Sequence, residues 1–255
     1  MGFYDSIAAH YHEIFPARPP AVKRLQTLAG EQPVRMLDVA CGTGEYAAAL
    51  ADRGHTVFAC DLDQEMVRRA AQKPFVKAFR ADMLKLSSSS VITGLAFDVV
   101  YCIGNSIVHL PDESSVSQAL HEMYAVMDAG GRLLLQVINY DRVLDTQTYC
   151  LPTIRNEQSG LTFSRRYVLQ SDGRLSFITQ LTVAGENEGA TLENRVPLLP
   201  LRSSLLKKLV LAAGFSNVSL SGNFNLDPFD PVRSEPLVLT AKKNGCPRRT
   251  DQTFA

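Results

Sequence analysis

Short apolar runs alternate with amphipathic stretches over the first 140 residues. In residues 34–40 only Arg35 and Asp38 interrupt the apolar side chains, which is typical of a strand buried on both faces. We expect strands at residues 34–40, 55–61, 75–81, 97–103 and 132–138. Helices are expected between them at residues 21–29, 45–53, 64–72 and 114–127, the last one ended by Gly130 and Gly131. This alternation predicts a parallel sheet covered by helices.

The rhythm changes after Tyr140. Residues 162–169 and 174–183 alternate on either side of a Ser171-Asp-Gly173 turn, which predicts a β-hairpin, and a further strand is expected at residues 191–199. A helix at residues 203–213 and strands at 218–221 and 237–242 return to the first sheet. The fold class is therefore expected to be α/β: a Rossmann-like doubly wound sheet with an antiparallel last strand pair and an inserted β-rich cap.

This pattern divides the chain into four parts. We expect a lid helix and core at residues 1–139, a substrate cap at 140–200, a return to the core at 201–244 and a flexible tail at 245–255. The chain opens with an amphipathic segment, residues 3–15, that places Tyr4, Ile7 and Tyr11 on one side. This segment is either a lid over a ligand or a helix that packs its aromatic rings on the domain.

A glycine turn joins the first strand to the first helix of the core. It reads Asp38-Val-Ala-Cys-Gly-Thr-Gly44, and Gly42 and Gly44 allow a ligand to approach the backbone closely. Asp61 ends the second strand, 17 residues after Gly44. In Rossmann-like sites an acid near this spacing accepts the ribose hydroxyls, although Asp61 also stands where a helix cap would. Together these features predict a nucleotide-like ligand.

The turn resembles motif I of the class I S-adenosylmethionine-dependent methyltransferases, usually Asp/Glu-x-Gly-x-Gly-x-Gly, with Ala40 at the first glycine position. A dinucleotide site would carry a third glycine where this chain has Ala47, which that fingerprint also permits. The glycine pattern alone therefore leaves NAD open. The resemblance implies S-adenosylmethionine as the cofactor.

Two further stretches are similar to glycine N-methyltransferases and their small-molecule relatives: residues 103–112, and Asn139-Tyr-Asp141 after the fifth strand. The Rossmann resemblance covers about residues 20–140 and 203–243. In glycine N-methyltransferases an arginine that meets the substrate carboxylate precedes Asn-Tyr-Asp, whereas this chain has Ile138. An isoleucine cannot form that clamp. Arg165 or Arg166 on the hairpin could supply the charge instead, if they are not simply exposed strand residues.

The resemblance implies roles for particular residues. Gly42, Gly44 and Asp61 are already indicated by the turn and the strand end. The full set expected to bind the cofactor is Tyr4, Tyr11, Asp38, Ala40, Gly42, Gly44, Asp61, Asp82, Met83, Ile103, Asn105 and His109. The catalytic candidates are His109, as a base if the acceptor arrives protonated, and Tyr140, through its hydroxyl. The alternatives are a loop histidine bonded to backbone and a packed tyrosine ring.

Methyl transfer from a sulfonium is an in-line displacement that needs positioning and the exclusion of water more than a nucleophilic side chain. The resemblance implies a methyltransferase acting on nitrogen or oxygen of a small molecule. The alternatives are an NAD-binding oxidoreductase, which the absence of a Tyr-x-x-x-Lys pair after the fourth strand disfavours, and a non-catalytic cofactor-binding relative.

Composition narrows the possible partners. The 26 basic and 26 acidic residues give zero formal net charge, so no nucleic-acid surface is expected. No apolar run reaches about 18 residues and the chain begins without the features of a signal peptide, so we expect a cytoplasmic protein without a membrane span. The five cysteines are dispersed, which favours free thiols over a metal site. The pattern makes no prediction about the oligomeric state.

Overall fold

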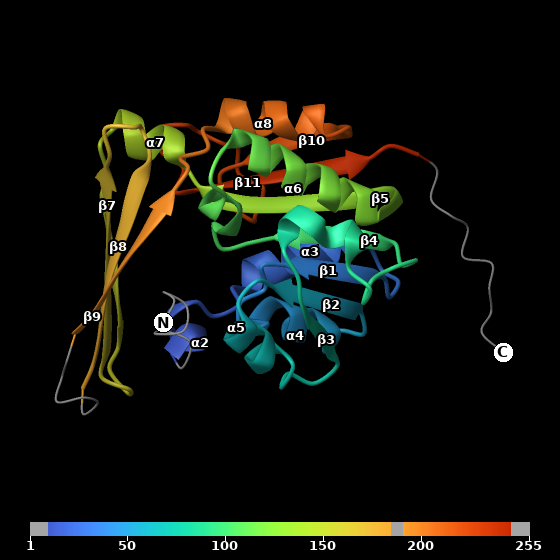
Figure 1. The fold of residues 1–255 in the computed structure, drawn as a ribbon, viewed down its shortest axis with the longest axis horizontal. Helices are drawn as coiled ribbons and strands as arrows, with labels where there is room; N and C mark the ends of the chain where they lie inside the picture. The colour runs from blue at the N-terminus through green and yellow to red at the C-terminus, as the bar shows by residue number, and fades with distance from the viewer. Residues whose placement is uncertain (1–9, 185–190, 246–255) are drawn as a thin grey trace.

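The computed structural model, which describes residues 10–184 and 191–245, contains a seven-stranded sheet with helices packed against it (Figure 1). Its strands are β1 (Arg35–Val39), β2 (Thr56–Asp61), β3 (Val76–Arg80), β4 (Phe97–Cys102), β5 (Met127–Ile138), β10 (Phe215–Ser221) and β11 (Pro236–Lys243). They lie in the order β10-β11-β5-β4-β1-β2-β3. Strands β1 to β5 pair in parallel, and β11 pairs antiparallel with β5 and β10. This confirms the expected Rossmann-like sheet and its antiparallel last pair.

The core lies on both faces of this sheet. Adjacent residues of β1 point to opposite faces, so Met36 joins one hydrophobic cluster and Leu37 the other. The first cluster includes α3 (Pro19–Ala29) and α4 (Glu45–Ala51), and the second includes α6 (Glu113–Val126) and α8 (Ser203–Ala212). The remaining helices are α2 (Tyr11–Ile14), α5 (Gln64–Ala70), α7 (Tyr140–Asp145) and the 3-10 turns η2 (Met83–Ser88) and η3 (Ser106–His109). Among the described residues, no helix is long and apolar enough to cross a membrane.

The prediction that Gly130 and Gly131 end a helix is wrong. Helix α6 ends at Val126, and Met127 already pairs with Phe97 as the first residue of β5. The strand then bulges, since the next pair in the ladder is Val99 with Arg132. A Cβ on Gly131 would lie 3.0 Å from the Phe97 carbonyl oxygen. The glycine is therefore needed for a close approach between strands, which helical spacing does not reveal.

The four-stranded cap sheet comprises β6 (Cys150–Asn156), β7 (Leu161–Leu169), β8 (Leu175–Val183) and β9 (Thr191–Leu198), all antiparallel in chain order. This confirms the expected hairpin, the further strand expected at residues 191–199 and the β-rich cap. Strand β6 and helix α7 were not predicted. Strand β6 lies at the edge of the sheet and contains Pro152, which only an edge strand tolerates easily.

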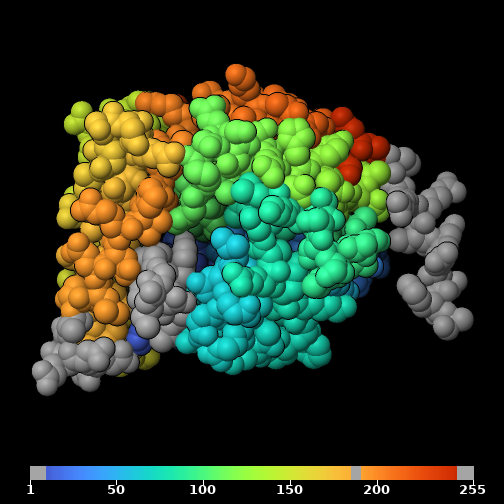
Figure 2. All heavy atoms as spheres, in the orientation of Figure 1, coloured from blue at the N-terminus to red at the C-terminus, as the bar shows by residue number. Residues whose placement is uncertain are grey.

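Two aromatic contacts join the cap to the rest of the molecule, in addition to hydrogen bonds from Asn156 and Ser159 to Glu13 and from Arg174 to the Pro111 carbonyl. The ring of Tyr167 on β7 lies 6.4 Å from that of Tyr140 after β5, and the ring of Phe163 lies 5.9 Å from that of Phe15 after α2. In Figure 2 the yellow and orange surface of the cap adjoins the green surface of the segments that follow β4 and β5. Aromatic rings thus fix the cap over the carboxyl end of β5.

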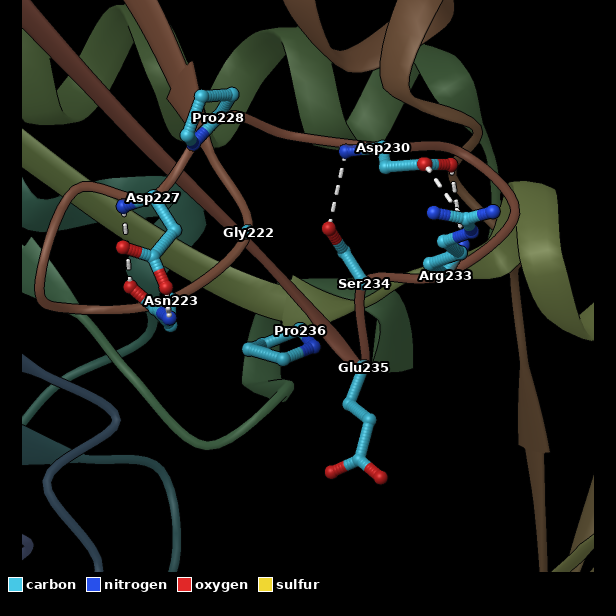
Figure 3. Close-up of a pocket in the computed structure, with 9 residues that line it drawn as sticks. All are labelled: Gly222, Asn223, Asp227, Pro228, Asp230, Arg233, Ser234, Glu235 and Pro236. Carbon is cyan, nitrogen blue, oxygen red and sulfur yellow. Dashed lines mark hydrogen bonds and ion pairs between the residues drawn. The ribbon is translucent and has the colours of Figure 1, made fainter.

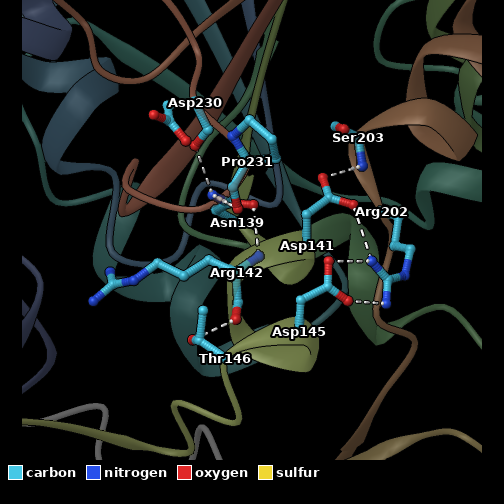
Figure 4. A network of polar contacts seen from close by, with 9 residues as sticks. All are labelled: Asn139, Asp141, Arg142, Asp145, Thr146, Arg202, Ser203, Asp230 and Pro231. Carbon is cyan, nitrogen blue, oxygen red and sulfur yellow. Dashed lines mark hydrogen bonds and ion pairs between the residues drawn. The ribbon is translucent and has the colours of Figure 1, made fainter.

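Asn139 ties the end of β5 to the loop between β10 and β11 (Figure 4). Its side-chain amide donates to the carbonyls of Asp230, Pro231 and Ser234, and its Oδ1 accepts from the Arg142 amide. Only 1% of the residue is exposed. Beside it, Arg202 bonds Asp145 and Asp141, which joins α7 to the start of α8.

We predict that Asn139→Asp lowers the free energy of unfolding by about 2–4 kcal/mol, because a buried carboxylate cannot donate to three carbonyls and meets them without a partner. Urea denaturation measures the change. Asn225→Asp, in the exposed part of the same loop, is the matched control and is expected to have little effect. Equal losses in the two variants would contradict a special role for Asn139.

Candidate functional site

The turn after β1 is held in the left-handed conformation. Gly42 and Gly44 have φ values of +56° and +80°, and Ala40 has +59°. A non-glycine residue pays about 1–2 kcal/mol for that conformation. Ala40 stands where the methyltransferase motif usually has glycine. Its positive φ explains why glycine is usual at this position.

Asp61 closes this turn from the end of β2. Its Oδ2 accepts from the Gly42 amide at 2.9 Å and its Oδ1 from the Asp63 amide at 3.0 Å. Burial raises the pKa of the carboxyl, and these two amide bonds oppose that rise. Each oxygen retains a lone pair for a hydroxyl. The helix cap of α5 is Asp63, whose carboxylate accepts from the Glu65 and Met66 amides, so Asp61 is not the capping residue.

A cavity of about 520 Å³ opens where β1, β2 and β3 end, which is the usual ligand position in an open α/β sheet. Seven of the residues expected at a cofactor site line it: Tyr11, Ala40, Gly42, Asp61, Asp82, Met83 and His109. Asp82 caps the turn η2 by accepting from the Leu84 amide at 2.9 Å. The structure thus brings together residues from five separate segments of the chain.

The sequence analysis did not single out other lining residues. They include the first turn of α5 from Asp63 to Met66, the end of β3 at Arg80 and Ala81, and Ser106 and Leu110 around η3. Only their position in the sequence could have identified these residues, because each one follows an expected strand end or is next to an expected site residue.

Four expected residues do not line the cavity. Gly44 packs against α5, because a Cβ there would lie 3.0 Å from that of Ala70. Ile103 is buried in the hydrophobic cluster of α3 and α4. Asp38 and Asn105 are described below, and Tyr4 lies outside the described residues.

Asn105 joins the ends of β4 and β5. Its Oδ1 accepts from the Ile138 amide at 3.0 Å, and its Nδ2 donates to the Tyr140 hydroxyl at 2.8 Å. Tyr140 is 1% exposed, and burial raises the pKa of its hydroxyl well above the ordinary value. Neither residue lines the cavity, so the contact positions the chain after β5.

His109 closes the cavity from the end of η3. Burial lowers the pKa of its imidazole to about 4. The ring is therefore neutral throughout the physiological range, and it is a weaker base than an ordinary histidine.

A second hollow, of about 390 Å³, lies within the loop between β10 and β11 (Figure 3). Two of its acids are bonded within the loop: Asp227 accepts from the Asn223 amide group, and Asp230 from the Val232 and Arg233 backbone amides. In the described part of the chain, no group of three or more metal-ligating side chains occurs.

Comparison with known proteins agrees with this geometry. Residues 36–131 match a family model described as a methyltransferase domain. The chain is 28% identical over 213 residues to a glycine/sarcosine N-methyltransferase of Aphanothece halophytica, covering 78% of this chain and 73% of that one. Against mouse glycine N-methyltransferase it is 33% identical over 136 residues, covering 48% and 45%. The chain thus spans about half the length of this mammalian relative.

The fold is similar to that of solved methyltransferases. The CcbJ methyltransferase of Streptomyces caelestis superposes with a TM-score of 0.77 at 20% identity, covering 94% of this chain and 96% of that one. An S-adenosylmethionine-dependent methyltransferase of Clostridium acetobutylicum gives 0.75 at 15% identity, covering 96% and 100%.

Residues 36–131 are a methyltransferase domain, and the chain resembles the family of class I S-adenosylmethionine-dependent methyltransferases. S-adenosylmethionine is the cofactor of this family. Besides the cavity, one further observation indicates that the site of this methyltransferase suits this cofactor. Oδ2 of Asp38 is buried beside the glycine turn and has no hydrogen-bond partner in the described structure. Burial raises the pKa of Asp38 to about 8; an interaction with the Tyr101 hydroxyl opposes this rise, and the charge of Asp61 adds to it. A buried acceptor without a donor suits the ammonium group of the cofactor.

We predict that Gly42→Ala weakens the binding of S-adenosylhomocysteine to this methyltransferase about tenfold. A Cβ on Gly42 would lie 2.7 Å from Cε1 of Tyr11 and would displace that ring. The affinity is measured by titration calorimetry for Gly42→Ala, Tyr11→Ala and the double variant. The double variant should lose less binding free energy than the sum of the losses in the two single variants. Gly54→Ala is the control, because Gly54 has a positive φ and no atom within 4 Å of an added Cβ. An equal loss of affinity in the control would contradict the Tyr11 contact.

Asp38 gives this methyltransferase a predicted pH dependence of stability. Its folded pKa of about 8 exceeds the ordinary 3.8, so between these values the folded state holds a proton that the unfolded chain has released. Raising the pH through this window therefore favours unfolding, by about 1 kcal/mol per pH unit, and the effect levels off above the folded pKa. Urea denaturation without cofactor should show this slope relative to Asp38→Asn. Parallel pH curves for the two proteins would mean that Asp38 is ionised when folded.

Proposed function

We propose that this methyltransferase transfers the methyl group to a nitrogen or oxygen of a small-molecule acceptor held between the core and the cap. The observation that carries the proposal is the position of the cap sheet, which rings fix over the carboxyl end of β5 beside the cofactor cavity. A cap of this kind excludes water and limits the size of the acceptor.

For the cofactor we propose the following roles. Asp61 accepts the ribose hydroxyls, Asp82 and Met83 face the adenine, and Asp38 takes the ammonium group. Ala40 and Gly42 allow close approach of the backbone, and Tyr11 covers the cavity from α2. The cavity lining and the buried Oδ2 of Asp38 support these roles. When bound, S-adenosylmethionine supplies an activated methyl group, so these residues only bind and orient it.

For the two catalytic candidates we propose different roles. His109 is neutral and lines the cavity, so it can accept a proton only from an acceptor group that is itself easily deprotonated. Tyr140 is a positioning residue, because its hydroxyl is bonded to Asn105 and its ring packs on Tyr167. The reaction then depends mainly on alignment, which suits a displacement at an activated methyl group.

Ile138 sets the expected acceptor. It is half-buried at the end of β5, where the glycine N-methyltransferases that this chain resembles carry an arginine. A carboxylate buried against an isoleucine would lack a cationic partner, at a cost of several kcal/mol. An acceptor with an apolar or aromatic body should therefore be preferred to free glycine.

We predict that this methyltransferase modifies aromatic or aliphatic amines or phenols faster than it modifies glycine and sarcosine. The measurement is transfer of labelled methyl groups to a panel of these acceptors, with S-adenosylhomocysteine formation as a second readout. Efficient turnover of glycine at low millimolar concentration would refute the inference from Ile138. If cofactor binds and no acceptor in a broad panel turns over, the non-catalytic alternative gains support.

A further inference from the structure

On β7 and β8 the inner face of the cap sheet is apolar except at one cross-strand pair. Inward positions on β7 and β8 pair as Leu161 with Val183, Phe163 with Leu181, Arg165 with Thr179, Tyr167 with Phe177 and Leu169 with Leu175. Residues directly opposite each other in a ladder share one face of the sheet. Arg165 and Thr179 therefore form a polar band between two aromatic rows. Asn194 on β9, opposite Thr179, continues this band.

The polar band lies between the two contacts that fix the cap. On one side, Phe163, Leu181 and their neighbours pack on α2 through Ile14 and Phe15. On the other side, Tyr167 and Leu175 pack on the core after β5. The band thus lies on the same face of the cap as these two contacts, and between them along the strands.

Both members of the pair carry a buried polar atom without a partner. Nε of Arg165 and Oγ1 of Thr179 have no hydrogen-bond partner in the described structure, and Thr179 is only 1% exposed. The Arg165 guanidinium is nevertheless anchored, since one of its Nη atoms donates to the Pro152 carbonyl at 2.9 Å. Buried donors without acceptors are costly and rare in native structures, and two side by side indicate a ligand.

The charge of this place is positive. No ion pair with a carboxylate is found for Arg165 or Arg18 among the described residues. Two effects lower the pKa of the Arg165 guanidinium, burial and the smaller effect of the like charge of Arg18, while Tyr167 opposes them. Bringing an anion to the guanidinium would offset both effects. Arg166, by contrast, lies on the outer face of β7 and is exposed.

We propose that Arg165 and Thr179 form the receptor for a carboxylate group of the methyl acceptor. This proposal rests on the proposed function, because it places the acceptor under the cap. The guanidinium presents Nε–H to one carboxylate oxygen, and the Thr179 hydroxyl donates to the same group. The flanking rings of Phe163 and Tyr167 receive the apolar body. Since Arg165 is on the cap and the glycine turn is on the core, the acceptor needs a longer body than that of glycine.

The first test uses phenylacetate and its uncharged analogue phenylacetamide as probes. Calorimetry on the protein loaded with S-adenosylhomocysteine should show that phenylacetate binds about tenfold more tightly. Arg165→Gln should remove this preference, and the matched control Arg166→Gln should retain it within about twofold. Equal affinity of the two probes for the natural protein, or equal losses in the two variants, would overturn the proposal.

The second test measures the contribution of the Thr179 hydroxyl separately from that of Arg165, and it includes a control for folding. Thr179→Val should weaken phenylacetate binding about threefold, and Thr179→Ser should restore it. Arg165→Lys keeps the charge without the planar edge, and should retain only part of the preference. S-adenosylhomocysteine affinity should be unchanged in these variants, which shows that the core is folded. A Thr179→Val protein that binds phenylacetate as the natural protein does would remove Thr179 from the receptor.

Turnover distinguishes this proposal from the broader one. Phenylalanine and 2-phenylethylamine are amines that differ by a carboxylate, and the first should be preferred only when Arg165 is present. If both are methylated equally well and Arg165→Gln changes nothing, the small-molecule function stands and the carboxylate receptor is wrong. If neither is methylated while phenylacetate still binds through Arg165, the receptor stands and the broader proposal loses its support.

Discussion

The hydrogen bond from the Gly42 amide to the Asp61 carboxylate is the constraint on which the site depends. It joins the ends of β1 and β2 and holds the left-handed turn against the end of the neighbouring strand. The turn in turn fixes the start of α4, and Asp61 positions the first residues of α5 through the Asp63 amide. One carboxylate therefore positions both the glycine turn and the start of α5, which line the cavity. A ligand that also bonds Asp61 couples its own binding to the geometry of the turn.

The cap adds a second constraint, in which aromatic packing is joined by hydrogen bonds from Asn156 and Ser159 to Glu13. Phe163 and Tyr167 each meet one ring from another part of the chain, so the cap has two fixed points on either side of Arg165. Apolar packing tolerates substitutions of similar volume, whereas the core turn depends on individual backbone angles and hydrogen bonds. The glycine turn and its neighbours are therefore expected to tolerate few substitutions. The cap is expected to tolerate substitutions that keep its aromatic contacts.

The sequence by itself determined the elements whose signal is local. Alternating strands and helices, the hairpin with its Ser171-Asp-Gly173 turn, and the Asp38 to Gly44 motif each depend on neighbouring residues, and together they predicted the Rossmann-like sheet and its β-rich cap. Seven of the expected cofactor residues line one cavity, and five of them do so because they stand at the ends of the adjacent strands β1, β2 and β3. Gly131 misled the analysis, since a glycine needed for contact with the neighbouring strand looks the same as one that ends a helix.

Only the tertiary structure decided how the remaining residues are used. Asn105 and Tyr140 were expected at the site; their side chains bond each other, and neither lines the cavity. Arg165 looked like either a clamp or an exposed strand residue, and pairing across the sheet placed it beside Thr179 on the buried face. Edge strand β6 has too few residues with a clear alternation to reveal itself. Burial and cross-strand register arise from contacts between distant segments, and the order of residues along one segment does not contain them.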